Sequence, residues 1–110
     1  MARAAMEELR SIGFASISAS YAAIGTQTDN PIRLFCITND TQGDMILSLD
    51  GVTDHFFLKA GSFKLFDVQS NMTPSIESSF VFSTGTQFFV KQVTAPVSGS
   101  VYVEVLYGFN

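Results

Sequence analysis

The side chains able to do acid–base or metal chemistry are few in this sequence, and they lie at its turns. One histidine is present, His55, and four aspartates recur at short spacings nearby: Asp40, Asp44, Asp50 and Asp54. Carboxylates bind calcium, but the ligand spacing of an EF-hand is absent, and aspartate is a common turn residue in its own right. We interpret the aspartates as turn residues, with a weak calcium site between neighbouring loops as the alternative.

No set of residues predicts catalysis. His55 has no second histidine or nucleophile at a recognisable spacing, so we interpret it as a turn or rim residue. Asp50 and Asp54 would need a basic or tryptophan-lined sugar site to act as glycosidase carboxylates, and the chain has no Trp. Cys36 lies in an apolar segment, which predicts a small core side chain. We therefore expect no enzyme, no metal site and no cofactor.

Composition and charge limit the possible partners. The chain has 110 residues, the size of one domain, with 46% hydrophobic and only 15% charged residues. An ordinary soluble domain carries about 25% charged residues, so we expect partners to cover part of the surface. The net charge is −4 and the six basic residues form no cluster, which argues against direct binding of nucleic acid.

The sequence also predicts where the chain is made. A single cysteine fits a reducing compartment, and charged residues stand near the start, where a signal peptide needs an apolar run. No run approaches the ~18 apolar residues of a membrane helix. We expect synthesis in the cytoplasm and no membrane contact, and without a secretory signal the glycosylation patterns at Asn39 and Asn71 carry no weight.

Hydrophobic periodicity predicts the strands that position these residues. Ser16–Tyr21 alternates as a half-buried strand does, and Ile32–Asn39 is apolar on both faces, as a central strand is. The middle of the chain, Leu47–Val68, reads as three short strands with reversals at Asp50-Gly51 and Ala60-Gly61-Ser62.

The second half of the chain continues this pattern. Gln69–Ser79 is a polar loop long enough to cross between two sheets, and Phe80–Phe82 with Thr86–Val93 reads as a hairpin. Val101–Tyr107 alternates as the last strand. Seven or eight such strands predict an all-β fold, either an antiparallel β-sandwich or a jelly-roll-like barrel.

The N-terminal residues differ from the rest. Ala2–Leu9 consists mostly of strong helix formers, which predicts a short helix or an arm that lies on a neighbour. We therefore divide the chain into an arm or short helix over residues 1–12 and a single β-sandwich domain over residues 13–110.

Paired phenylalanines indicate a buried second face. In Phe56-Phe57 and Phe88-Phe89, successive side chains point to opposite faces of a strand. One ring of each pair can face the core, and the other must face another sheet, a loop or another subunit. A two-sided core under long loops is the alternative. The candidate subunit-interface residues are Met6, Leu9, Ile12, Phe14, Phe57 and Phe89.

Six segments carry a resemblance to a known family: Arg33–Thr41, Leu47–Asp54, Ala60–Val68, Gly85–Gln92, Ala95–Val103 and Leu106–Gly108. Together they resemble a set of small proteins of similar length encoded among the virion genes of tailed bacteriophages. The resemblance covers nearly the whole chain after Arg10. Its motifs are turn and strand signatures, so no functional residue is carried over from it.

This resemblance implies a non-enzymatic virion structural protein, made in the host cytoplasm and assembled in multiple copies. Two placements are open: a head decoration or cement protein, and a neck, collar or adaptor ring component. The implied partners are other copies in a homo-oligomer and other virion proteins, namely the major capsid protein or the portal and its adaptor. The alternative function is a tail-associated binding module for a host-surface receptor or glycan.

Overall fold

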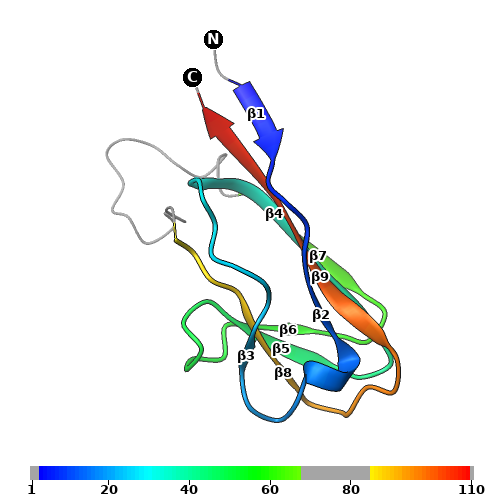
Figure 1. Ribbon diagram of the computed structural model, residues 1–110. Helices are drawn as coiled ribbons and strands as arrows, with labels where there is room; N and C mark the ends of the chain where they lie inside the picture. Colours follow the sequence, from blue (N-terminus) through cyan, green and yellow to red (C-terminus); the bar gives the residue numbers. More distant parts are fainter. Residues whose placement is uncertain (1–2, 68–84, 110) are drawn as a thin grey trace.

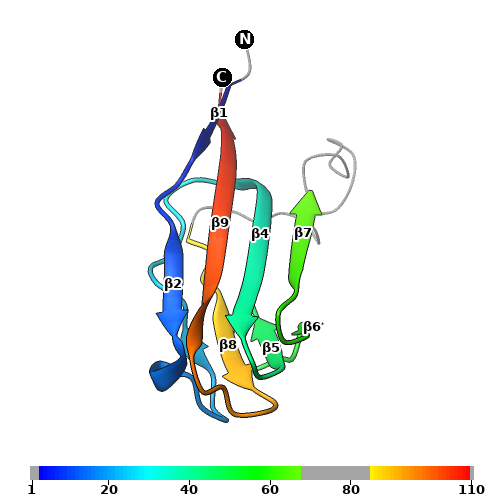
Figure 2. The same ribbon diagram turned by 90° about the vertical axis from the view of Figure 1, so that its right-hand side faces the viewer.

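The computed structural model describes residues 3–67 and 85–109, which form two antiparallel sheets packed face to face (Figures 1 and 2). The five-stranded sheet contains β1 (Arg3–Met6), β2 (Arg10–Gly13), β9 (Gly99–Phe109), β4 (Ile32–Thr41) and β7 (Phe63–Asp67). The four-stranded sheet contains, in spatial order, β3 (Ala22–Ala23), β8 (Phe89–Gln92), β5 (Met45–Ser48) and β6 (Phe56–Leu58). The all-β sandwich prediction is confirmed, with nine strands in the described residues.

The long strands β4 and β9 form the centre of the five-stranded sheet. β9 pairs with β1 and β2 along one side and with β4 along the other, while β7 closes the far side of β4. At one end of the molecule, β1 and the end of β9 project as a two-stranded ribbon beyond the rest of the sandwich, as both views show (Figures 1 and 2). The molecule measures 45 × 25 × 21 Å.

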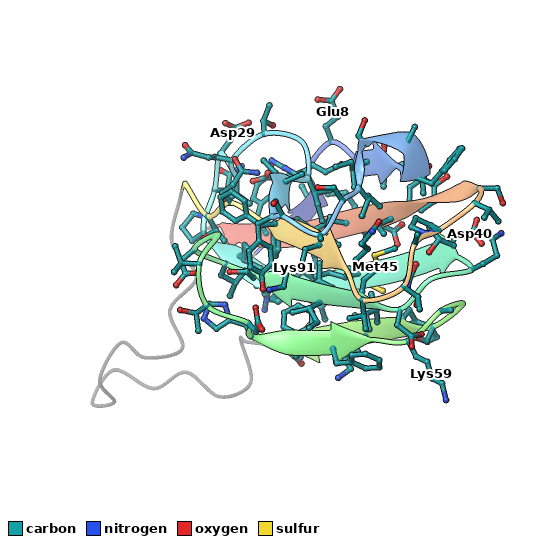
Figure 3. The ribbon with its side chains drawn as sticks, turned by 90° about the horizontal axis from the view of Figure 1, so that it is seen from below. Glu8, Asp29, Asp40, Met45, Lys59 and Lys91 are labelled. Carbon is teal, nitrogen blue, oxygen red and sulfur yellow. The ribbon has the colours of Figure 1, made fainter. Side chains whose placement is uncertain are left out.

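The core lies between the two sheets and follows the period-2 pattern of the strands. The inward-facing residues of β9, Val101, Val103 and Val105, are fully buried and pair in register with residues of β4. The Phe35 ring stacks on Phe66 with 4.9 Å between ring centroids. The other buried apolar residues include Ile24, Ile37, Met45, Leu47, Leu58, Phe88 and Val90. Figure 3 shows Met45 in the interior and Lys59 and Glu8 pointing into solvent.

The N-terminal helix predicted over Ala2–Leu9 is wrong. Arg3–Met6 is a strand, each residue opposite one of the last residues of β9. Helix propensity is weak for so short a segment, and the ladder with β9 supplies the backbone hydrogen bonds that an isolated turn of helix lacks.

One further local prediction also needs correction. Ser16–Tyr21 is not a strand: a 3₁₀ turn covers Phe14–Ser16, and β3 comes later and is only two residues long. The turn predicted at Ala60-Gly61-Ser62 is present, and the strands on either side of it, β6 and β7, belong to different sheets. The turn carries the chain from one sheet to the other, with Gly61 at φ 72°.

Of the remaining predictions, one is confirmed, one is wrong, and two concern segments outside the residues that the structure describes. Ile32–Asn39 is central, as predicted, between β9 and β7. Cys36 is half-buried and alternates with the buried Phe35 and Ile37, so the prediction of a core thiol is wrong. Gln69–Ser79 and Phe80–Phe82 lie outside the described residues, and the strands on either side of them, β7 and β8, belong to different sheets.

Replacing Phe35 with alanine tests the core. Phe35 is 1% exposed and contacts the rings of Phe66 and Phe88, so Phe35→Ala should lower the free energy of unfolding by about 3–5 kcal/mol. Phe57, 45% exposed, is the matched control, and Phe57→Ala should cost about 1 kcal/mol or less. Denaturant unfolding followed by circular dichroism measures both, and equal losses would contradict this description of the core.

Candidate interaction surface

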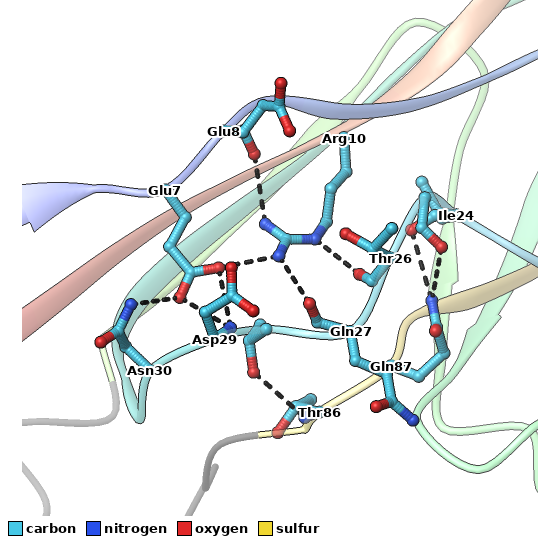
Figure 4. Close-up of polar contacts among 12 residues, drawn as sticks. Glu7, Glu8, Arg10, Ile24, Thr26, Gln27, Asp29, Asn30, Thr86 and Gln87 are labelled. Carbon is cyan, nitrogen blue, oxygen red and sulfur yellow. Dashed lines mark hydrogen bonds and ion pairs between the residues drawn. The ribbon is translucent and has the colours of Figure 1, made fainter.

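A buried ion pair fixes the N-terminal strands onto the sandwich (Figure 4). The Arg10 guanidinium and the Glu7 carboxylate lie 2.7 Å apart, with side chains 5% and 4% exposed. Arg10 also donates hydrogen bonds to the backbone carbonyls of Thr26 (2.7 Å), Gln27 (2.9 Å) and Glu8 (3.2 Å). Each charge therefore has the several partners that a buried ion requires.

The Glu7 carboxylate is equally well bonded. The side-chain amide of Asn30 donates to it at 3.0 Å and the backbone N–H of Asp29 at 3.1 Å. Burial opposes the charged form, but these bonds and Arg10 outweigh it and hold the pKa of Glu7 below its ordinary value. Gly25, at φ 65°, completes the site, because a Cβ there would lie 2.9 Å from the Cγ of Arg10.

The loop held by Arg10 also reaches the four-stranded sheet. Thr28 and Thr86 are joined by a backbone hydrogen bond of 2.9 Å, and the N–H of Gly85 donates to the carbonyl of Thr28 at 2.8 Å. The side-chain amide of Gln87 donates to the carbonyl of Gly25 at 3.1 Å (Figure 4). The position of β1 and β2 is thus connected through the loop to the residues that lead into β8.

A second buried polar group joins the two sheets at the opposite end of β4. Asn39 is fully buried, and its amide donates to the carbonyls of Gly43 (2.8 Å) and Leu58 (3.2 Å). The Thr41 hydroxyl donates to the Asn39 side-chain oxygen at 2.6 Å. The backbone N–H of Asn39 donates to the carbonyl of Ser62, where the chain crosses between sheets. The sequence predicts Asn39 as the end of an apolar strand and as a glycosylation pattern without weight, and gives no sign of its buried hydrogen bonds.

Two residues predicted at turns, Asp50 and His55, hold the loop between β5 and β6 in place. The Asp50 carboxylate accepts hydrogen bonds from the backbone N–H groups of Thr53 and Val52, both at 2.8 Å, and these bonds lower its pKa. The Nδ1 of His55 accepts from the backbone N–H of Leu49 at 2.9 Å. Asp50 lies in the turn predicted for it, and His55 is exposed at the end of the same loop, in agreement with the prediction of a turn or rim residue.

Asp54 belongs to a small polar cluster on the four-stranded sheet. It accepts a hydrogen bond from the Tyr21 hydroxyl and lies 3.0 Å from the ammonium of Lys91. That ammonium also lies 4.7 Å from the centroid of the Tyr21 ring. Burial, the bond to Asp54 and the negative charge of Asp54 raise the pKa of Tyr21. The cluster attaches the loop after β5 to β8 and to the segment before β3.

The face of the five-stranded sheet that points away from the core, here called the outer face, carries exposed apolar residues. Three cross-strand rows follow from the register: Met6–Leu106–Leu34–Asp67, Glu104–Cys36–Leu65 and Ser11–Tyr102–Thr38–Phe63. Phe63 is 65% exposed, and Leu65 and Met6 are each 57% exposed. A concentration of apolar side chains on one sheet face is typical of a surface that another protein covers.

The structure distributes the six predicted interface residues over different surfaces. Met6 lies on the outer face; Leu9, Phe14 and Phe57 are also exposed, whereas Ile12 packs against the core. Phe89 is half-buried, its ring 3.3 Å from where a Cβ on Gly51 would be. Phe63 and Leu65 were not predicted as interface residues. The signal for them was the period-2 pattern of β7, whose partner strand β4 is apolar on both faces.

Among residues 3–67 and 85–109, no three His, Cys, Asp or Glu side chains gather closely enough to hold a metal ion. In the same part of the chain, no helix has the length and hydropathy needed to cross a membrane.

The fold defines a class, an all-β sandwich protein with a projecting N-terminal ribbon. No protein-family model matches the chain, and no curated protein matches it. Among solved structures, the chain is similar to the Dit protein of phage SPP1, which is described as a paradigm of the hub adsorption apparatus in phages that infect Gram-positive bacteria. The TM-score is 0.42 at 14% identity over 97% of this chain. This chain matches only 49% of the length of Dit.

Arg10 and Glu7 make the N-terminal attachment sensitive to acid. Because the pKa of Glu7 in the folded protein lies below its ordinary 4.5, the carboxylate stabilises the fold above that pH. The contribution is lost as pH falls through the folded pKa. Arg10→Met should cost about 3–5 kcal/mol at neutral pH, since it leaves a buried carboxylate unpaired, and Glu7→Gln should flatten the pH dependence of stability below 4.5. Denaturant unfolding across pH measures both, with Lys59→Met as the exposed control.

The polar cluster predicts a perturbed tyrosine. Tyr21 should ionise at a pH above the ordinary range of a tyrosine in an ultraviolet absorbance titration, and Tyr21→Phe should remove that late transition. Asp54→Asn should lower the pKa of Tyr21 part of the way toward 10.0, because burial, the largest cause of the shift, remains. An unchanged titration in Asp54→Asn would show that the Tyr21–Asp54 bond does not form.

Proposed function

We propose that this chain is a non-enzymatic structural subunit of a tailed-bacteriophage particle, present in several copies. The observation that carries the proposal is the outer face with its projecting β1–β9 ribbon. Three apolar side chains there, Met6 on one edge strand and Phe63 and Leu65 on the other, are more than half exposed. Exposed apolar side chains on one sheet face are typical of a surface that a partner covers. The sequence resemblance to small virion proteins supports the same conclusion.

The ribbon supplies a second feature suited to assembly. β1 is the last strand on its side of the sheet, so its outer edge presents backbone groups that β9 does not use. The Arg10–Glu7 pair holds the following residues on the sandwich, so the ribbon is attached at its base. A strand placed in this way can add its edge to a neighbouring protein without unfolding the core.

The partners we propose are other copies of the chain and other virion proteins. A decoration or cement protein would contact the major capsid protein at many equivalent positions on the head. A neck, collar or adaptor component would contact the portal or its adaptor and close into a ring by rotation. Both placements use an apolar face that is covered after assembly.

Removing the ribbon strand tests the proposal. A chain without residues 1–6 keeps Glu7 and Arg10 and should stay folded, but it should not be incorporated into particles. Quantitative gels and immunogold labelling of purified particles measure incorporation and position, with Val52→Lys, altered at an exposed loop residue, as the control.

The outcomes separate the parts of the proposal. Normal incorporation of the truncated chain would remove the role of the ribbon while leaving the structural function. Absence of the full-length chain from purified particles would overturn the function itself. Labelling confined to the tail tip, together with binding of the isolated protein to host cells, would favour the receptor-binding alternative.

A further inference from the structure

We propose that Lys64 keeps the five-stranded sheet from joining a second copy of this chain edge to edge at β7. This contact is separate from those of the proposed function, because it is one that the chain avoids. A lysine can prevent such pairing when it lies on the core-facing side of an edge strand and water is its only partner. Lys64 meets both conditions.

β7 is the longest edge strand in the described part of the chain. It has five residues and pairs only with β4, and Figure 2 shows it at one side of the sheet. The four-stranded sheet ends in β3 and β6, which have two and three residues, and edge strands this short offer little backbone to another chain. β7 therefore presents the longest edge to an incoming strand.

The backbone groups of β7 that β4 does not use can be assigned from the ladder. The N–H of Asn39 donates to the carbonyl of Ser62 at 2.8 Å, and bonded and non-bonded pairs alternate from there along the antiparallel strands. The backbone N–H and C=O groups of Phe63 and Leu65 therefore point away from β4. A strand added at β7 would bond to these groups.

Lys64 lies on the core-facing side of β7. It is opposite Ile37, which is fully buried, and residues opposite each other in a ladder point to the same face. Two residues further on, Phe66 points to the same side and packs against Phe35 and Phe56. Lys64 is nevertheless exposed, and its ammonium makes no hydrogen bond or ion pair with the other described residues. Water therefore solvates this charge at the open edge of the strand.

A second copy paired at β7 would remove that water. In a two-fold antiparallel pairing centred on Lys64, the two ammonium groups lie directly opposite each other, and like charges in that position repel. In a pairing centred on Leu65, each Lys64 lies opposite Phe66 of the other copy, and its charge is covered without a partner, which is costly. Both registers use the outward backbone groups of β7, and Lys64 makes each of them unfavourable.

Without the lysine, β7 would be a strand prone to association. Phe63, Leu65 and Phe66 are apolar, and the first two are more than half exposed. Apolar residues on a free edge strand favour aggregation, and a charge placed among them is a common safeguard. β1 lies at the opposite edge of the same sheet, so an open β7 could also pair with β1 of a further copy. Such a head-to-tail contact does not close and would produce a filament.

Sedimentation velocity of the full chain over a range of concentrations tests the role of Lys64. Lys64→Met removes the charge and keeps the length of the side chain, and it should strengthen self-association about tenfold or more. Lys59→Met, at an exposed residue just after β6, is the matched control and should leave association unchanged. Both variants lower the net charge from −4 to −5, which by itself opposes association. Lys64→Arg retains the charge and should behave as the wild type does.

Hydrogen exchange identifies the edge that pairs. In Lys64→Met, the backbone amides of Phe63 and Leu65 should exchange more slowly as the protein concentration rises, while circular dichroism confirms that the variant is folded. Lys64→Gln, which is polar and uncharged, gives the same test if Lys64→Met does not fold. A neutral variant that associates no more than Lys59→Met overturns the proposal. So does association that leaves the amides of Phe63 and Leu65 unprotected, or a wild-type chain that protects them by associating.

Discussion

The Arg10 guanidinium is the group on which the arrangement of the N-terminal half depends. A cation removed from water needs partners on every side, and those partners come from three places: the Glu7 carboxylate, the carbonyl of Glu8 and the loop carbonyls of Thr26 and Gln27. The chain can satisfy Arg10 only if β1, β2 and the loop before β4 take their observed positions together. One side chain thereby couples segments that are otherwise held by separate ladders.

β9 transmits this constraint to the rest of the sheet. It pairs with β1 and β2 on one side and with β4 on the other, so a shift at the N-terminus would have to pass through its register. Near the C-terminal end of β4, the buried side chain of Asn39 joins the two sheets by hydrogen bonds. Its amide donates to the carbonyl of Gly43, on the connection before β5, and to that of Leu58, the last residue of β6. The two buried polar sites therefore hold the sandwich at opposite ends, with an apolar core between them.

Much of the fold could be predicted from the sequence, because alternation of apolar residues is a direct consequence of strand geometry. β4, β5, β7 and β9 fall close to their predicted positions for that reason. The wrong predictions fall where pairing with a distant part of the chain decides the secondary structure. Arg3–Met6 has the composition of a helix and becomes a strand only because the end of β9 is opposite it. The turn at Ala60-Gly61-Ser62 was correctly predicted, but its sequence does not say whether the next strand returns to the same sheet.

The candidate surface was predictable only in part. The apolar residues on both faces of β4 indicated that both faces are covered. They do not show which face packs against the four-stranded sheet, because the register with β9 decides this. Arg10 and Glu7 were missed because charged residues are usually exposed, and their three-residue spacing means nothing until a loop more than ten residues later encloses them. Cys36 was assigned to the core because an apolar strand gives no sign of which side is in.

The projecting ribbon has a mechanical consequence. Arg3 and Phe109 stand opposite each other at its tip, and the two strands run antiparallel from there into the sandwich. A force that separates these two residues would break the ladder one pair at a time, like a zipper, and would meet little resistance. A force that pulls β9 along its own length would load its pairs with β2 and β4 together, in shear. The sandwich therefore yields to a small force that separates Arg3 from Phe109 and resists a larger force applied along β9.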